Sequence, residues 1–289
     1  GYTTYIEGQL NASLFSKDNI TFAAWIAIET FPTGQDGGIQ LGSIFSNNEL
    51  DVAINSQGRI FVNIENGGQI TSAQVMESDE WIHMAVTVDV ANGMLILYKN
   101  GQAIGSTHVS DRFSWANRNF WIGKYRTDVL YAGFNINHFN GIIDEVVIHN
   151  KTLSAAQIAQ DAAFKPTYSP DLTIPASRFA NDIHRPRYHA IPGASWANEP
   201  HGLIYYNNMY HMFFQKNANG PYWSSLHWGV LTSPDLVNWN EEAPVLRPDP
   251  LTTWDRIGIW SGCALFDNEN NPIIFYTGVD GAKAGIGVA

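Results

Sequence analysis

The chain has 289 residues, enough for about two domains, and its 45% hydrophobic and 13% aromatic residues exclude a disordered protein. Sixteen Lys and Arg against 27 Asp and Glu give a net charge of −11, which argues against nucleic-acid and anionic-membrane partners because like charges repel. The sequence has no run of apolar residues long enough for a membrane-spanning segment, and its single cysteine, Cys263, excludes an internal disulfide.

The first half of the sequence consists of short apolar segments separated by turn residues, the pattern of an antiparallel β-sandwich. Asn100-Gly101 is a strong signal for a type I′ hairpin. One helix is expected at 154–163, because Gln157 follows Ser154 at the spacing of a capping box. The expected strands are 21–28, 51–54, 59–64, 81–88, 94–98 and 141–149.

Asp144 and Glu145 place two charges inside the last of these strands. Neighbouring side chains of a strand point to opposite faces, so we expect that these carboxylates do not act together on one bond. His83 also lies in an apolar strand, where a hydrogen-bonded structural histidine is expected. The nine histidines are scattered without the spacing of a metal site.

Three segments of this half resemble the laminin G-like domains, which are concanavalin-type jelly rolls. Residues 81–87 (WIHMAVT) resemble the family pattern W-x-H-x-A-V-T, residues 97–101 (LYKNG) resemble L-Y-x-N-G, and residues 141–154 resemble the closing strand and helix. The resemblance covers residues 1–163 and implies a jelly-roll β-sandwich. Members of that superfamily bind carbohydrate, carry calcium at an edge, or serve as packing modules, and all three alternatives stay open here. No cofactor is required, and a structural calcium in the jelly roll is one expectation.

The segment 164–177 contains three prolines and no periodic pattern, so we expect a linker there and a second domain over 178–289. Antiparallel hairpins are again the simplest account of the second domain. The expected strands are 203–206, 209–215, 227–232, 264–267 and 273–278.

The segment before the first of these strands, 195–202 (SWANEPHG), is expected to be a loop. It resembles the W-M-N-D-P-N-G motif of the family 32 glycoside hydrolases, the invertase, levanase and fructanase group. Four further segments resemble motifs of that family in the same order: 213–218 (FFQKNA), 228–239 (WGVLTSPDLVNW), 260–264 (WSGCA) and 272–278 (PIIFYTG). The members are five-bladed β-propellers that act on β-fructosides.

The resemblance implies a retaining glycosidase in which one carboxylate attacks the anomeric carbon and a second protonates the leaving oxygen. It puts Glu199 at the nucleophile and implies a carbohydrate substrate. It also implies an extracytoplasmic protein, whether secreted, periplasmic or on the cell surface. The residues implied to line the sugar subsite are Asn198, Gln215, Trp223, Trp260 and Ser261.

Two departures from the family pattern bear on activity. Glu199 stands where the family has Asp, so its carboxylate reaches further by one C–C bond, roughly 1.5 Å. The family's R-D-P and E-C motifs, the second of which holds the general acid, would follow residue 275 and are expected outside this chain. Residues 178–289 supply about two blades at roughly 40–45 residues each. We therefore expect an incomplete five-bladed β-propeller, completed by the remainder of the same chain or by other chains.

Three functions remain open at this point: a glycoside hydrolase with an accessory jelly roll, a non-catalytic carbohydrate-binding protein on the same scaffold, and a structural adhesion module. A Glu in place of the family's Asp is compatible with the second. Fold alone does not decide between them, because function resides in the site.

Overall fold

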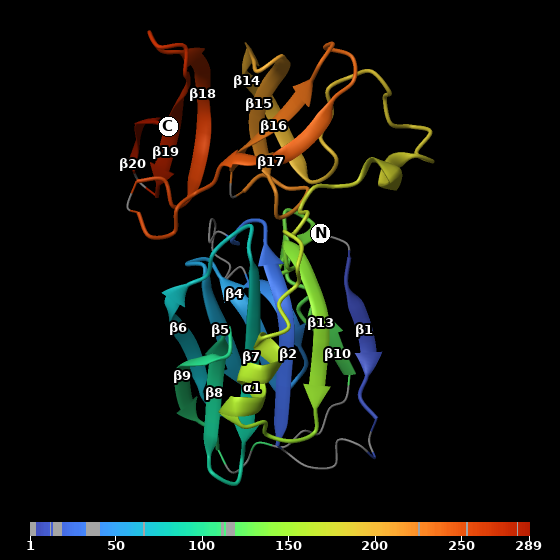
Figure 1. The fold of residues 1–289 in the computed structure, drawn as a ribbon, viewed down its shortest axis with the longest axis vertical. Helices are drawn as coiled ribbons and strands as arrows, with labels where there is room; N and C mark the ends of the chain where they lie inside the picture. Colours follow the sequence, from blue (N-terminus) through green and yellow to red (C-terminus); the bar gives the residue numbers. More distant parts are fainter. Residues whose placement is uncertain are drawn as a thin grey trace. The chain divides into compact units, whose positions relative to one another are not determined.

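The computed structural model describes residues 4–11, 13, 19–32, 41–65, 67–110, 113, 119–224, 226–252, 254–281 and 283–289. These residues form antiparallel sheets with one α-helix and one short 3-10 helix, so the all-β fold class expected from the sequence is confirmed. The chain divides into two compact units (Figure 1), of which one extends to Asp171 and the other runs from Leu172 to Ala289. The dividing point lies inside the segment 164–177.

The first unit is a sandwich of two antiparallel sheets. The six-stranded sheet has the order β1 (Ile6–Gln9), β10 (Asn119–Ile122), β3 (Leu41–Ser46), β4 (Leu50–Asn55), β5 (Arg59–Ile64) and β6 (Gln69–Val75). The five-stranded sheet has the order β13 (Gly141–His149), β2 (Ile20–Ile28), β7 (Trp81–Asp89), β8 (Met94–Lys99) and β9 (Gln102–His108). A small ribbon is formed by β11 (Leu130–Tyr131) and β12 (Phe134–Asn135).

The core of the first unit lies between the two sheets, where inward side chains of both form one cluster. Strand β5 alternates between half-buried and buried residues, as expected for a strand with one face in the core. Strand β2 is buried at every position, and helix α1 (Ala155–Ala162) covers part of its outer face at Ala23. Ile158 of α1 packs there against Ala23, Ala85 and Tyr98.

Two local predictions in this unit are confirmed. Ser154 caps α1 in a capping box, because its Oγ accepts from the backbone N–H of Gln157 while the Gln157 side chain accepts from the Ser154 backbone N–H. Asn100 and Gly101 both have positive φ, 49° and 80°, as a type I′ turn requires.

The second unit contains two antiparallel sheets and the 3-10 helix η1 (Ala176–Phe179). The four-stranded sheet runs in chain order through β14 (Trp196–Tyr206), β15 (Met209–Asn217), β16 (His227–Ser233) and β17 (Asn240–Leu246). The three-stranded sheet runs through β18 (Gly258–Phe266), β19 (Pro272–Asp280) and β20 (Lys283–Val288). Successive antiparallel sheets of this kind are the units of a propeller.

The two sheets of this unit share a small core and contact each other chiefly through β14 and β18. The Trp228 indole N–H donates to the carbonyl of Trp260 at 2.8 Å, which links β16 to β18. The backbones of β14 and β18 approach each other closely, since a Cβ added at Gly202 would lie 3.1 Å from the backbone nitrogen of Ala264. The first strands of the two sheets are thereby held side by side.

Candidate active site

The six residues implied as a sugar subsite come from three strands and one loop of the second unit. They are Asn198 and Glu199 in β14, Gln215 in β15, Trp223 in the connection between β15 and β16, and Trp260 and Ser261 in β18.

Four of these residues form one chain of hydrogen bonds that ends on the carboxylate of Glu199. Asn198 Nδ2 donates to Gln215 Oε1 at 3.3 Å, and Gln215 Nε2 donates to Ser261 Oγ at 3.0 Å. Ser261 Oγ then donates to Glu199 Oε1 at 2.7 Å. Gln215 is 5% exposed, whereas Glu199 is exposed. A buried amide thus orients an exposed carboxylate through one hydroxyl, and every donor in the chain points toward the negative charge.

Irregular strand pairing places these side chains. The pairing of β14 with β15 shifts between Ala197 and Pro200, which spans Asn198 and Glu199, and it shifts again between Pro200 and Gly202. The pairing of β18 with β19 shifts between Trp260 and Gly262, which spans Ser261. A β-bulge turns a side chain out of the regular alternation and is common beside active sites.

The prediction of a loop at 195–202 is therefore wrong, because β14 already begins at Trp196. Pro200 is tolerated since β14 is the first strand of its sheet and pairs only with β15. The strand expected at 264–267 likewise begins earlier, at Gly258. Gly262 is required next to the bulge, because a Cβ there would lie 1.9 Å from the carbonyl oxygen of Phe275.

Two indole rings lie together at this site. The rings of Trp223 and Trp260 meet edge to face, with centroids 5.9 Å apart and an interplanar angle of 64°. Trp223 is 41% exposed, so an aromatic surface is open to solvent there. Aromatic side chains are frequent in the walls of small-molecule sites.

The sequence analysis missed His201, which is 8% exposed and stacks on Trp228 with ring centroids 4.6 Å apart. Burial lowers the pKa of His201, and the negative charge of Glu199 opposes that shift. Within the described part of the chain, His201 Nε2 and Trp260 Nε1 are buried nitrogens without a hydrogen-bond partner. The motif could have indicated His201 as a site residue, because His201 occupies a position where the family pattern has Asn.

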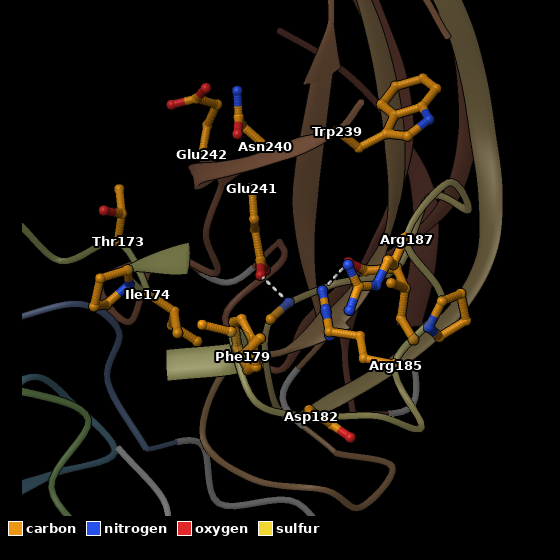
Figure 2. A pocket seen from close by; sticks show the side chains of 15 residues that line it. Thr173, Ile174, Phe179, Asp182, Arg185, Arg187, Trp239, Asn240, Glu241 and Glu242 are labelled. Carbon is orange, nitrogen blue, oxygen red and sulfur yellow. Dashed lines mark hydrogen bonds between the residues drawn. The ribbon is translucent and has the colours of Figure 1, made fainter. Parts of the chain in front are cut away.

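A separate cavity of about 610 Å³ lies between the segment that precedes β14 and strand β17, and none of the six site residues lines it (Figure 2). Glu241 of β17 accepts from the backbone N–H of Gly193 and pairs with Lys216 Nζ at 2.6 Å. The Arg185 guanidinium lies over the Phe179 ring at 4.3 Å and donates to the carbonyl of Ile191 at 2.7 Å. These contacts hold the segment before β14 against the sheet.

An all-β chain with two such units matches two known families of domain. Residues 1–159 match the concanavalin A-like lectin/glucanases superfamily, and the chain belongs to that superfamily. Residues 189–285 match the glycosyl hydrolases family 32 N-terminal domain. Both resemblances found in the sequence are thereby confirmed, in the expected order along the chain.

Curated relatives are similar over about one third of the chain. The chain is 42% identical over 101 residues to an insoluble β-fructofuranosidase isoenzyme of Arabidopsis thaliana, which is 35% of this chain and 17% of that protein. It is 38% identical over 108 residues to insoluble isoenzyme 1 of Oryza sativa subsp. indica, which is 37% of this chain and 18% of that protein. The chain thus spans less than one fifth of the length of these relatives.

Among solved structures, fructan 1-exohydrolase IIa from Cichorium intybus is similar at 32% identity and a TM-score of 0.32, over 36% of this chain and 19% of that one. Within the described residues, no helix has the length and apolar character needed to span a membrane. No group of three or more His, Cys, Asp and Glu side chains in that part of the chain is arranged to hold a metal ion. The structural calcium stays a prediction.

Proposed function

We propose that the second unit carries the nucleophile of a glycoside hydrolase that acts on β-fructosides. The observation that carries this proposal is the hydrogen-bond chain from Asn198 through Gln215 and Ser261 to Glu199. The similarity to relatives named β-fructofuranosidase supports the choice of substrate class. We also propose an extracytoplasmic location, on the ground of the family alone.

In the proposed reaction, the Glu199 carboxylate attacks the anomeric carbon while the glycosidic C–O bond breaks and the leaving oxygen takes a proton from the general acid. Water then hydrolyses the covalent glycosyl-enzyme intermediate and returns a proton to that acid. Ser261 engages Oε1 of Glu199, so Oε2 is the oxygen that attacks. The hydroxyl holds the carboxylate in one orientation and stabilises its charged form. Such alignment matters because a misplacement of about 1 Å can cost on the order of 10²-fold in rate.

The other residues have distinct proposed roles. Trp223 and Trp260 present their rings to the apolar faces of the sugar. Asn198, at the end of the hydrogen-bond chain opposite Glu199, is exposed and can also bind a sugar hydroxyl. Gln215 uses both ends of its amide within the chain, so it acts as a positioning residue for Ser261. His201 Nε2 and Trp260 Nε1 are two further nitrogens for substrate oxygens after a small rearrangement.

A retaining mechanism also needs a general acid, with its carboxyl roughly 5–5.5 Å from the nucleophile. We assign this group to sequence that follows residue 275, as the resemblance to family 32 implies. The remainder of the propeller, whether from the same chain or from another, would bring that carboxyl to Glu199.

A non-catalytic carbohydrate-binding protein is the second candidate, and the Glu at position 199 favours it. The additional methylene displaces the carboxylate relative to the family's Asp by roughly 1.5 Å unless the backbone compensates. The bulge at Asn198 and Glu199 is where such compensation would occur.

The test measures fructose released from sucrose, inulin and levan by a protein with the complete propeller and by residues 1–289. We expect release by the complete protein and little or none by residues 1–289, since general acid–base catalysis contributes about 10²–10⁴-fold. Glu199→Gln should lower release by about 10⁶-fold, the order of loss found when a catalytic nucleophile is removed.

Glu269→Gln is the matched control, because Glu269 is an exposed carboxylate in the turn between β18 and β19. A complete protein that binds fructan without releasing fructose would establish the binding function instead. Rapid release by residues 1–289 would show that the general acid lies within them.

A further inference from the structure

The outer face of the five-stranded sheet contains a cavity of about 390 Å³ that the hydrolase proposal does not use. Asp144 of β13, Trp25 of β2 and His83 of β7 are direct neighbours across three paired strands. All three line the cavity, helix α1 contributes Asp161, and the segment that follows the helix contributes Tyr168. The cavity therefore lies on the face opposite the core, beside α1.

A bulge brings two carboxylates into this cavity. The pairing of β13 with β2 is irregular between Asp144 and Val147, and Glu145 has a φ of 49°. Both Asp144 and Glu145 line the cavity as a result. The expectation that they point to opposite faces is wrong, because it assumed a regular strand. A left-handed residue other than glycine inside a strand is unusual and often marks a functional position.

All the charged side chains among the lining residues of the cavity are acidic. Asp144, Glu145 and Asp161 are its charged lining residues, and none of the lining residues is Lys or Arg. Lys165 is adjacent in sequence to two lining residues but is exposed and does not line the cavity. Asp144 is oriented by the Tyr168 hydroxyl, which donates to Oδ2 at 3.3 Å, and by the backbone N–H of Glu145, which donates to Oδ1 at 2.8 Å.

His83 adds an independent sign of a ligand. His83 is one of the lining residues, it is only 3% exposed, and its Nδ1 is buried with no hydrogen-bond partner among the described residues. Burial lowers the pKa of His83, and the negative charge of Asp161 opposes the shift. A neutral imidazole has one donor and one acceptor nitrogen, so a buried nitrogen without a partner is costly unless a ligand meets it.

The aromatic and acidic groups together indicate the class of ligand. The Trp25 ring meets the His83 ring edge to face at 5.2 Å, and the Trp81 indole N–H fixes the Tyr168 backbone carbonyl at 3.0 Å. No group of three or more His, Cys, Asp and Glu side chains among the described residues is arranged to hold a metal ion, so the three carboxylates are not the ligand set of one metal. Carboxylates spread around an aromatic wall suit a larger organic cation.

We propose that this cavity binds a primary ammonium ion on a sugar or alkyl frame, with Asp144 and Glu145 beside the charge and Asp161 adding to the negative potential of the cavity. Trp25 and Tyr168 lie against the carbon frame, and His83 Nδ1 is a hydrogen-bond partner. The first unit would then recognise amino-substituted ligands independently of any fructoside bound by the second unit.

The first experiment compares charged ligands with neutral analogues on the full chain. Calorimetric titration at low salt uses glucosamine against N-acetylglucosamine and glucose, and n-butylammonium against n-butanol. We expect the amines to bind at least about tenfold more tightly than their neutral partners, because only the amines carry the charge. If only glucosamine binds, the cavity recognises the sugar frame as well as the charge. If both amines bind, the charge dominates recognition. Equal binding of the neutral analogues, or no binding of either amine, would overturn the proposal.

The second experiment removes charge without changing side-chain shape. The double variant Asp144→Asn, Glu145→Gln should weaken amine binding by about tenfold or more, while Glu7→Gln, an exposed carboxylate on the other sheet, should leave it unchanged. Far-UV circular dichroism verifies the fold of each variant. Unchanged affinity in the double variant would overturn the proposal.

Calcium that raises Tm through these carboxylates, with no amine bound, would make the cavity a metal site instead. Glu199→Gln should bind amines as the wild type does, which separates this test from the hydrolase proposal.

Discussion

The two units bury apolar and polar residues in different proportions. The first encloses a large cluster of aliphatic and aromatic side chains between its sheets, many of them completely buried. The second has a small apolar cluster of Ile204, Phe213, Trp228, Val230 and Ile259. Its other buried positions include many polar residues, among them Gln215, Asn217, Asn219, Ser224 and His227.

This difference reflects what each unit has to hold in place. Apolar burial contributes roughly 25 cal/mol per Å² without fixing directions, so it stabilises a sandwich whose inner faces only have to fit. Buried amides and hydroxyls contribute less net stability, but they specify orientation because each needs a partner at a defined angle. In the second unit the buried amide of Gln215 donates to Ser261, whose hydroxyl in turn donates to Glu199, so one buried polar group helps to orient the carboxylate of the proposed reaction.

The largest expected effect comes from truncating the core of the first unit. Ile26 is fully buried and pairs with Ile82 and Ile143 on the two neighbouring strands. Ile26→Ala should lower the free energy of unfolding of this unit by about 2–5 kcal/mol, from lost burial and the cavity left behind. Urea titration followed by circular dichroism, on the full chain, measures the loss.

The matched control is Ile6→Ala, since Ile6 is 59% exposed and should change stability by no more than about 0.5 kcal/mol. Sugar binding at the second unit should not change in either variant, because distant sites act independently. A loss of that binding in Ile26→Ala would break the separation of roles between the units.

The next effect is on rate rather than on stability. Ser261→Ala removes the hydrogen bond to Glu199, and hydrogen bonds to charged groups contribute about 1.5–3 kcal/mol. We expect fructose release by the complete protein to fall by about 10–150-fold, with little change in Tm because Ser261 is exposed. Cys263→Ala, an exposed residue two positions further along β18, is the control. An equal fall in both variants would show that Ser261 has no special role.

A third effect concerns the pH dependence of the first unit. Burial and the positive charge of Lys124 lower the pKa of His138 to about 4, with Asp128 in opposition. The unfolded chain, with a histidine pKa near 6.5, therefore takes up this proton first as the pH falls. The stability contribution is complete above about pH 6.5 and is lost between there and about pH 4. After discounting for solvent screening we expect a loss of about 1–2 kcal/mol.

Urea unfolding of the first unit at several pH values between 7 and 4 measures this slope. His138→Gln should flatten this slope. An identical slope in wild type and His138→Gln would show that other groups cause the acid sensitivity of the unit.

The sequence alone predicted those features that local residues determine. The capping box at Ser154 and the turn at Asn100-Gly101 depend on a few consecutive residues, and both are confirmed. The candidate site residues were identified by motif resemblance, and the structure brings four of them into one hydrogen-bond chain.

The bulges were not predictable from local pattern. A bulge arises from the pairing of one strand with another, and its position depends on a partner that is distant in sequence. For this reason the alternation rule failed at Asp144 and Glu145, and the segment at Glu199 looked like a loop. For the same reason the local sequence pattern did not indicate His201, which packs against Trp228 at the second bulge in β14.

The smallest effect tests whether a local signal alone stabilises the helix of the first unit. Ser154→Ala removes the side chain that accepts from the N–H of Gln157, and loss of such a cap costs about 1 kcal/mol. Helix α1 should nevertheless stay docked, because Leu153 and Ile158 remain buried against the five-stranded sheet. Ser154→Asp should retain nearly all of the stability, since Asp also caps helices well. Urea unfolding of the first unit compares the three proteins. A loss of several kcal/mol in Ser154→Ala would mean that the cap, and not the apolar contact with the sheet, holds the helix in place.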